Sequence, residues 1–230
     1  MSGHSERSVK VHPPAVRIMH WINAVAIILM IGSGWHIYNN DPIFGWIGFP
    51  RWAVLGGDPE LTYKLNKDVG FGNALLWHFA AMWVFFLNGT AALIYGLATR
   101  RIQRKWFPIT VAGLWRDFAD ALAFKLSHDD LSVYNAVQRL SYVGVVLATL
   151  LVFASGLAIW KPVQFQWLTA LFYDFQGARL AHFLAMAAIV LFLIVHVALA
   201  VLVPRTIKAM ITGTVRVKNK NAAAMPAPGE

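Results

Sequence analysis

The stretch ARLAHFLAMAAIVLFLIVHVALA, residues 178–200, decides the fold class of this protein. About 20 consecutive apolar residues allow an α-helix to cross the roughly 30 Å hydrocarbon core of a bilayer. The same stretch carries His182 and His196, and ionisable side chains are costly inside a membrane. It therefore predicts a membrane span whose two histidines have partners.

The composition of the whole chain is that of a membrane protein. Of its 230 residues, 58% are hydrophobic and 13% are charged, whereas soluble domains average about 25% charged residues. The chain contains no cysteine, which excludes disulfides, thiolate-bound iron–sulfur clusters and thioether-attached c-type haem. Histidine is then the best remaining metal ligand, apart from methionine.

Four apolar runs reach membrane length, at about residues 16–38, 74–97, 141–160 and 180–203. They predict an all-α fold, an integral membrane four-helix bundle that forms a single domain over residues 1–230. No small-residue cleavage site follows the first run, so we expect it to be retained as a span. The end of the chain, residues 214–230, is predicted to be a disordered tail. We identify no convincing internal repeat.

The segment between the second and third runs is too charged to cross the membrane. Its apolar residues are spaced for an amphipathic helix on the membrane surface, and a loop with a helical turn or two is the alternative. These residues are Leu114, Trp115, Phe118, Leu122 and Phe124.

Charged residues fall mainly on one side of the predicted membrane. The chain carries a net charge of +9, yet in the connections 39–72 and 161–179 the five basic and five acidic residues cancel. The basic clusters TRRIQRK (99–105) and RVKNK (216–220) belong to the other side, with both termini. Because cytoplasmic segments carry the excess of Lys and Arg, we expect both termini to lie on the cytoplasmic side of the membrane. The excess of basic residues therefore indicates how the chain is oriented in the membrane, rather than nucleic-acid binding.

The depth of each histidine sorts the four span histidines into pairs. His182 and His196 are 14 residues apart, so they share one helix face about 21 Å apart along the axis. His78 begins the second span on the outer side, at the depth of His182, and His20 begins the first span on the cytoplasmic side, at the depth of His196. Two haems stacked across the bilayer would explain both pairs, because a neutral imidazole is a good axial ligand of haem iron.

Other interpretations of these histidines are weaker. Each would alternatively hydrogen-bond a neighbouring helix, but four histidines in two depth pairs favour ligation. A closed zinc site needs four ligands at one point. His36 points nearly opposite to His20 and is expected at the outer interface.

Two arginines precede predicted ligands by one helical turn on the side nearer water. Arg17 stands three residues before His20, and Arg179 three before His182. Each either pairs with a haem propionate or extends its charged end to the membrane surface.

With these residues the chain resembles the bacterial cytochrome b561 superfamily. The phrase RIMHWINA (17–24), His78 and the pair His182 and His196 are similar to the dihaem cytochrome b subunits of nickel-iron hydrogenases, formate dehydrogenases and thiosulfate reductases. The resemblance covers residues 11–213. It implies two haem b groups in the pairing given above.

The same resemblance implies the function of an electron-transfer subunit of an oxidoreductase complex. Electrons would pass between quinone and an extracytoplasmic redox partner, with a molybdopterin enzyme favoured over a hydrogenase. The phrase YNAVQRLSY (134–142) is similar to the quinone-pocket segment of the formate dehydrogenase relatives. It implies Tyr134, Asn135 and Gln138 as quinone-binding residues, although Val137 and Arg139 replace that segment's glycine and lysine.

Two other functions remain compatible with the sequence. One is a stand-alone superoxide:quinone oxidoreductase, as in some short relatives. The other is a haem-free transporter or scaffold, which the spans disfavour because they contain no internal proline of the kind that breaks transporter helices.

Overall fold

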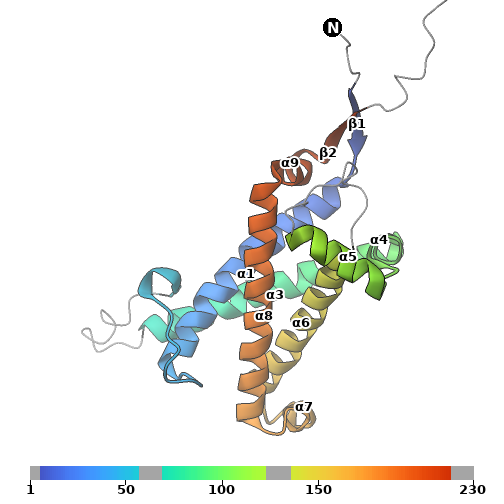
Figure 1. Cartoon of the computed structure of the whole chain (residues 1–230). Helices are drawn as coiled ribbons and strands as arrows, with labels where there is room; N and C mark the ends of the chain where they lie inside the picture. The colour runs from blue at the N-terminus through green and yellow to red at the C-terminus, as the bar shows by residue number, and fades with distance from the viewer. Residues whose placement is uncertain (1–5, 57–68, 123–135, 219–230) are drawn as a thin grey trace, which may run out of the picture.

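Four long helices form the body of the molecule (Figure 1). The computed structural model describes residues 6–56, 69–122 and 136–218. Its long helices are α1 (Pro14–Asn40), α3 (Val69–Ala98), α6 (Ala136–Trp160) and α8 (Phe175–Leu202). In this described part of the chain, the same four segments are long and apolar enough to cross a membrane. The predicted all-α membrane fold is therefore confirmed.

Local sequence explains where these helices begin and end. α1 starts with Pro14 at its first helical position, where a missing N–H is tolerated. At the start of α8, the Asp174 carboxylate accepts a hydrogen bond from the Gly177 backbone N–H at 2.7 Å, which is an N-cap. Pro204 then separates α8 from α9 (Pro204–Thr212), because proline cannot continue the backbone hydrogen-bonding of a helix.

The long helices pair as two hairpins, α1 with α3 and α6 with α8, which cross at an angle in Figure 1. Each hairpin has its own small core. Ala26, Met30, Ala81 and Phe85 form the core of the first, and Val152, Ala185 and Ile189 that of the second. Small residues such as these alanines let membrane helices approach closely.

Aromatic side chains connect one hairpin to the other. Phe85 of α3 stacks on Phe153 of α6, with ring centroids 5.9 Å apart. At the end away from the termini, Tyr38 of α1 stacks on Phe183 of α8 at 4.9 Å. The histidines of α1, α3 and α8 also meet between the hairpins.

Shorter elements cover the two ends. They are β1 (Glu6–Lys10), the 3-10 helix η1 (Arg51–Ala53), α4 (Arg101–Trp106), α5 (Val111–Leu122), α7 (Gln166–Leu171), α9 and β2 (Thr214–Lys218). The amphipathic helix expected between the second and third spans is α5; Phe124 of that prediction lies outside the described residues. Asp117 of α5 accepts a hydrogen bond from the backbone N–H of Ala136 at 2.6 Å, so α5 caps the start of α6.

The prediction of a disordered tail from residue 214 was wrong at its beginning. Thr214–Lys218 form β2, which pairs antiparallel with β1, Glu6 opposite Lys218. The reason is that β1 and β2 lie side by side at the same end of the molecule (Figure 1), where their backbones satisfy each other's hydrogen bonds. Residues 219–230 lie outside the described part.

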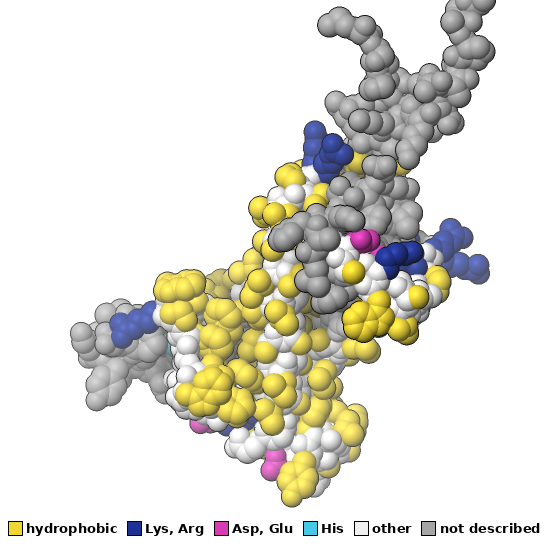
Figure 2. All heavy atoms as spheres, viewed as in Figure 1, with side chains coloured by type: hydrophobic (Ala, Val, Ile, Leu, Met, Phe, Trp, Pro, Cys, Tyr) yellow, Lys and Arg dark blue, Asp and Glu magenta, His cyan; other side chains and the backbone are white. Residues whose placement is uncertain are grey.

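The surface fits a bilayer. Hydrophobic side chains cover the middle of the helices in Figure 2, and lysines and arginines gather at the end that carries α4 and α9. Ile28, Leu76 and Leu191 are each more than 60% exposed. Soluble monomers rarely expose so large a continuous apolar surface.

Candidate functional site

Two pairs of histidines face each other between the hairpins. His20 of α1 and His196 of α8 have ring centroids 6.2 Å apart. His78 of α3 and His182 of α8 have ring centroids 6.4 Å apart. The structure thus brings together the same two pairs that the sequence grouped by depth, each containing one residue of α8.

The spacing of both pairs suits a metal ion between the rings. An imidazole nitrogen binds a first-row metal at about 2 Å, so two imidazoles on opposite sides of one ion have ring centres roughly 6 Å apart. No hydrogen bond joins two of these imidazoles in the described residues. In the same residues no group of three or more His, Asp or Glu side chains gathers. Each pair could therefore hold a metal ion with two ligands, which suits a metal whose other ligands come from a cofactor.

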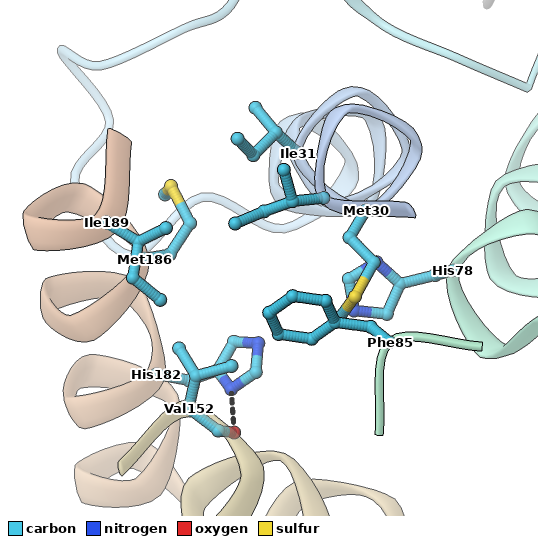
Figure 3. Close-up of a pocket in the computed structure, with 9 residues that line it drawn as sticks. Met30, Ile31, His78, Phe85, Val152, His182, Met186 and Ile189 are labelled. Carbon is cyan, nitrogen blue, oxygen red and sulfur yellow. Dashed lines mark hydrogen bonds between the residues drawn. The ribbon is translucent and has the colours of Figure 1, made fainter. Parts of the chain in front are cut away.

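An apolar pocket lies beside the pair His78 and His182, which we call the outer pair (Figure 3). The two imidazoles enter it from α3 and α8, on different hairpins. Its other walls include Met30, Phe85, Val152 and Ile189. Pockets that bind cofactors are mostly apolar, with a few polar groups that fix orientation.

Serines hold both imidazoles of the outer pair. The Oγ of Ser33 lies 3.1 Å from Nδ1 of His78, and the Oγ of Ser155 lies 3.2 Å from Nδ1 of His182. The Val152 carbonyl also lies 3.0 Å from Nδ1 of His182, the dashed contact in Figure 3. Each serine belongs to the helix that pairs with the histidine's own helix.

Hydrogen bonds to oxygen acceptors favour one tautomer of both rings. At His182 the Val152 carbonyl, which can only accept, lies 3.0 Å from Nδ1. Ser33 donates its hydroxyl proton to the Leu29 carbonyl, and Ser155 to the Leu151 carbonyl, both at 2.6 Å. A hydroxyl has one proton, so towards the histidine each serine oxygen accepts. Nδ1 is then the protonated nitrogen, and the lone pair of Nε2 is available to a metal.

Two glycines leave room for these rings. A Cβ atom added at Gly34 would lie 3.4 Å from Cε1 of His78, and one added at Gly156 would lie 3.2 Å from Cε1 of His182. Each glycine directly follows one of the two serines. The Ser-Gly sequence therefore both binds the imidazole and makes space for it.

The pair His20 and His196, which we call the inner pair, has different surroundings. His20 has a buried Nδ1 atom with no hydrogen-bond partner among the described residues. Its ring meets Trp21 edge-on, with centroids 5.2 Å apart, and His196 stacks on Phe192 at 5.5 Å. Aromatic contacts position the inner pair, whereas hydrogen bonds position the outer pair.

The two candidate arginines already have protein partners. Arg17 donates from Nη1 to the Ile211 carbonyl of α9, while its Nε is buried without a hydrogen-bond partner. Arg179 binds the backbone carbonyl of Asp41, and its Nη1 lies 3.0 Å from the Asp41 carboxylate. Sequence pattern does not predict these contacts, because their partners are distant in the chain.

The predicted quinone residues are only partly described. Tyr134 and Asn135 lie outside the described residues. Gln138 lies in the first turn of α6 and is exposed. Nearby, Arg139 donates to the Pro108 carbonyl at 2.7 Å, and Tyr142 stacks on Trp106 at 6.0 Å.

His36, which is expected at the outer interface, is covered by the chain that follows α1. It is 1% exposed, and its Nδ1 lies 3.2 Å from the Leu55 carbonyl. The reason is that the chain after α1 folds back over this side of the helix, which periodicity within α1 alone does not reveal.

The roles of Ser33 and Ser155 escaped the sequence analysis, and so did a local repeat that contains them. LMIGSG (29–34) in α1 matches LVFASG (151–156) in α6. LWHFAAM (76–82) in α3 matches LAHFLAM (180–186) in α8. The signal was present, but the matching segments are separated by unequal connections and become obvious only when the hairpins are compared in space.

Comparison with known proteins identifies a family. A family model described as prokaryotic cytochrome b561 matches residues 11–213. The putative protein-methionine-sulfoxide reductase subunit YedZ1 of Azospira oryzae is 41% identical over 209 residues, which cover 91% of this chain and 99% of that protein.

A second group of relatives is more distant. The probable Ni/Fe-hydrogenase B-type cytochrome subunit of Cupriavidus necator is 25% identical over 218 residues, covering 87% of this chain and 82% of that protein. The protein of the same description from Bradyrhizobium diazoefficiens is 24% identical over 214 residues, covering 84% and 78%.

Proposed function

This chain belongs to the prokaryotic cytochrome b561 family and is a membrane haem protein of electron transfer. From that premise we propose that it binds two haem b groups and passes electrons between a quinone pool and an extracytoplasmic redox partner. The observation that carries the proposal is the pair of His–His separations, 6.2 and 6.4 Å. Both suit one iron atom between two imidazoles.

In the proposal His20 and His196 hold the inner haem, and His78 and His182 hold the outer haem. When bound, each haem supplies a one-electron redox centre. The residues of the chain do the positioning: α8 contributes one ligand to each site, so a single helix sets the separation of the two haems. The apolar walls would keep water from the iron. Ser33 accepts from Nδ1 of His78, and Ser155 and the Val152 carbonyl accept from Nδ1 of His182, which leaves Nε2 of both outer ligands unprotonated.

Arginines at the two membrane edges are proposed to pair with haem propionates. The buried Nε of Arg17, which lacks a partner among the described residues, is a donor that a propionate of the inner haem would satisfy. Arg179 is bound to Asp41 and would pair through its remaining donors, because a guanidinium has five N–H groups.

Quinone is proposed to exchange electrons at the inner haem. The resemblance of residues 134–142 to a known quinone-pocket segment supports this, and so does the exposure of Gln138 at the start of α6. We assign Tyr134, Asn135 and Gln138 to the pocket. With positive charge gathered at the end that carries α4 and α9, this end is proposed to face the cytoplasm of a bacterium, across its inner membrane.

The partner is proposed to be a reductase that accepts electrons outside the cytoplasm. The relative with 41% identity is described as a subunit of a protein-methionine-sulfoxide reductase, and a reductase consumes electrons. Electrons would then flow from quinol through the inner haem to the outer haem and on to the partner. A molybdopterin enzyme remains the expected partner class, ahead of a hydrogenase.

The test uses the purified full-length chain and its native membrane. The expected results are two b-type haems per polypeptide, reduction of both by a quinol, and recovery of a reductase subunit with the tagged chain. Absence of haem from protein made with ample haem would refute the cytochrome function. Rapid reduction of the isolated chain by superoxide, with no reductase recovered, would favour the stand-alone superoxide:quinone oxidoreductase instead.

A further inference from the structure

The outer pair sits in a duplicated piece of structure. The repeat places Ala81 and Ala185 at matching positions, each 3% exposed. Phe85 and Ile189 also match, and both line the pocket. The two histidines and the two serines follow the same correspondence, so each hairpin contributes one equivalent half of the outer site.

Both serines are completely buried. Ser33 and Ser155 are each 0% exposed, and a buried hydroxyl is costly unless hydrogen-bonded. Each hydroxyl already donates a hydrogen bond to the carbonyl four residues earlier, as a serine within a membrane helix commonly does. The contact with histidine Nδ1 is additional, and it occurs in both halves of the site. At His182 the serine shares Nδ1 with the Val152 carbonyl, which lies 3.0 Å away, so we expect Ser155→Ala to have a smaller effect than Ser33→Ala.

A hydrogen bond from Nδ1–H to an oxygen has a known effect on an imidazole ligand. It fixes the ring orientation and raises the basicity of the nitrogen that binds the metal. A more basic ligand stabilises ferric over ferrous iron and so lowers the reduction potential. The inner pair offers a contrast, since the buried Nδ1 of His20 has no such partner in the described part of the chain.

We propose that Ser33 and Ser155 are positioning residues of the outer haem, which hold the imidazoles of His78 and His182 as Nδ1–H tautomers and lower the reduction potential of that haem. The proposal rests on the proposed function, because it requires a haem between those histidines. This inference goes beyond the proposed function because it assigns the serines of both halves of the repeat the same role at the outer haem. It assigns them no role at the inner haem.

The experiment is a redox titration of the full-length protein, followed by visible and electron paramagnetic resonance spectra, with haem counted per chain. The variants are Ser33→Ala, Ser155→Ala and the double change. The matched control is Thr149→Ala, because Thr149 of α6 makes the same type of backbone contact, with the Val145 carbonyl at 2.7 Å, without touching a histidine among the described residues.

We expect each single alanine variant to keep two haems and to shift the potential of one haem, the same haem in both, to a more positive value. The double variant should shift it further, with a changed low-spin signal from that haem alone. Ser33→Thr, which keeps the hydroxyl, should restore the wild-type potential, and Thr149→Ala should leave both haems unchanged.

Other outcomes distinguish the two proposals. Two haems with unchanged potentials in the double variant would overturn the role of the serines and leave the proposed function intact. An equal shift of both haems, or haem loss that threonine does not reverse, would also count against the serines. A wild-type protein without haem would instead overturn the proposed function, and this inference with it.

Discussion

Nδ1 of His20 is buried without a hydrogen-bond partner among the described residues, although its ring lies 6.2 Å from that of His196. At the outer pair, by contrast, both Nδ1 atoms have oxygen partners. The two sites therefore share their spacing but differ in how the imidazoles are held. This difference allows variants to address one site at a time.

Replacing an inner ligand should remove one haem and leave the other. In His20→Ala and His196→Ala we expect one haem per chain, with the same absorption component missing in both, because one imidazole cannot retain a low-spin site. Haem extraction and the reduced-minus-oxidised spectrum measure this. The control is His36→Ala, because His36 is a span histidine outside both pairs, 1% exposed and in contact with the Leu55 carbonyl; this variant should keep both haems and lose about 1–3 kcal/mol of stability. Two haems retained in His20→Ala would contradict the assignment.

Adding a methyl group beside an outer ligand should disturb the outer haem. In Gly156→Ala the new Cβ would lie 3.2 Å from Cε1 of His182, so the ring must shift by a few tenths of an ångström. We expect an altered low-spin resonance signal from one haem, with a stability cost of about 1–3 kcal/mol. Gly144→Ala is the control, because no atom lies within 4 Å of its added Cβ. Identical spectra for the two variants would show that His182 is not constrained by this contact.

Removing haem should loosen the contact between the hairpins. Each proposed haem connects a ligand of the α1 and α3 hairpin to α8, whereas the helices otherwise contact each other mainly within their own hairpin. A ligand present at 1,000 times its dissociation constant contributes about 4 kcal/mol of stability. Haem-depleted protein should therefore melt at a lower temperature, with a wider distribution of spin-label distances between α3 and α6. Unchanged melting would mean that haem does not hold the hairpins together.

The cap that α5 provides for α6 should contribute to stability. Asp117 is 6% exposed and accepts the Ala136 N–H at 2.6 Å. Asp117→Ala should cost about 1–2 kcal/mol, while Asp117→Asn, which keeps an acceptor oxygen, should cost much less. Thermal unfolding of the purified protein checks this order. Asp120→Ala on the same helix is the control, and an equal loss there would refute a specific cap.

The sequence predicted the spans well because each span is a local property. A run of apolar residues such as 178–200 must form a helix in the bilayer, since only internal hydrogen bonds can satisfy its backbone there. The grouping of His20 with His196 and of His78 with His182 was also predictable. Depth in the membrane follows from position along a helix of known rise, and alternating span directions leave few combinations.

Contacts between distant segments were not predictable in the same way. The burial of His36 under the Leu55 carbonyl, the pairing of β1 with β2 and the contact of Arg179 with Asp41 all depend on where a connection folds back. Connections have no regular period, so hydrophobic pattern does not specify their course.

By itself, then, the sequence determined that this is an all-helical membrane protein and which histidines share a depth. It did so because the bilayer imposes length, polarity and helical periodicity on every span. Only the tertiary structure decided how the hairpins cross, that Ser33 and Ser155 hold the outer imidazoles, and that His20 has no such partner. These features depend on which face of one helix meets which face of another, and that is settled by packing among side chains far apart in the chain.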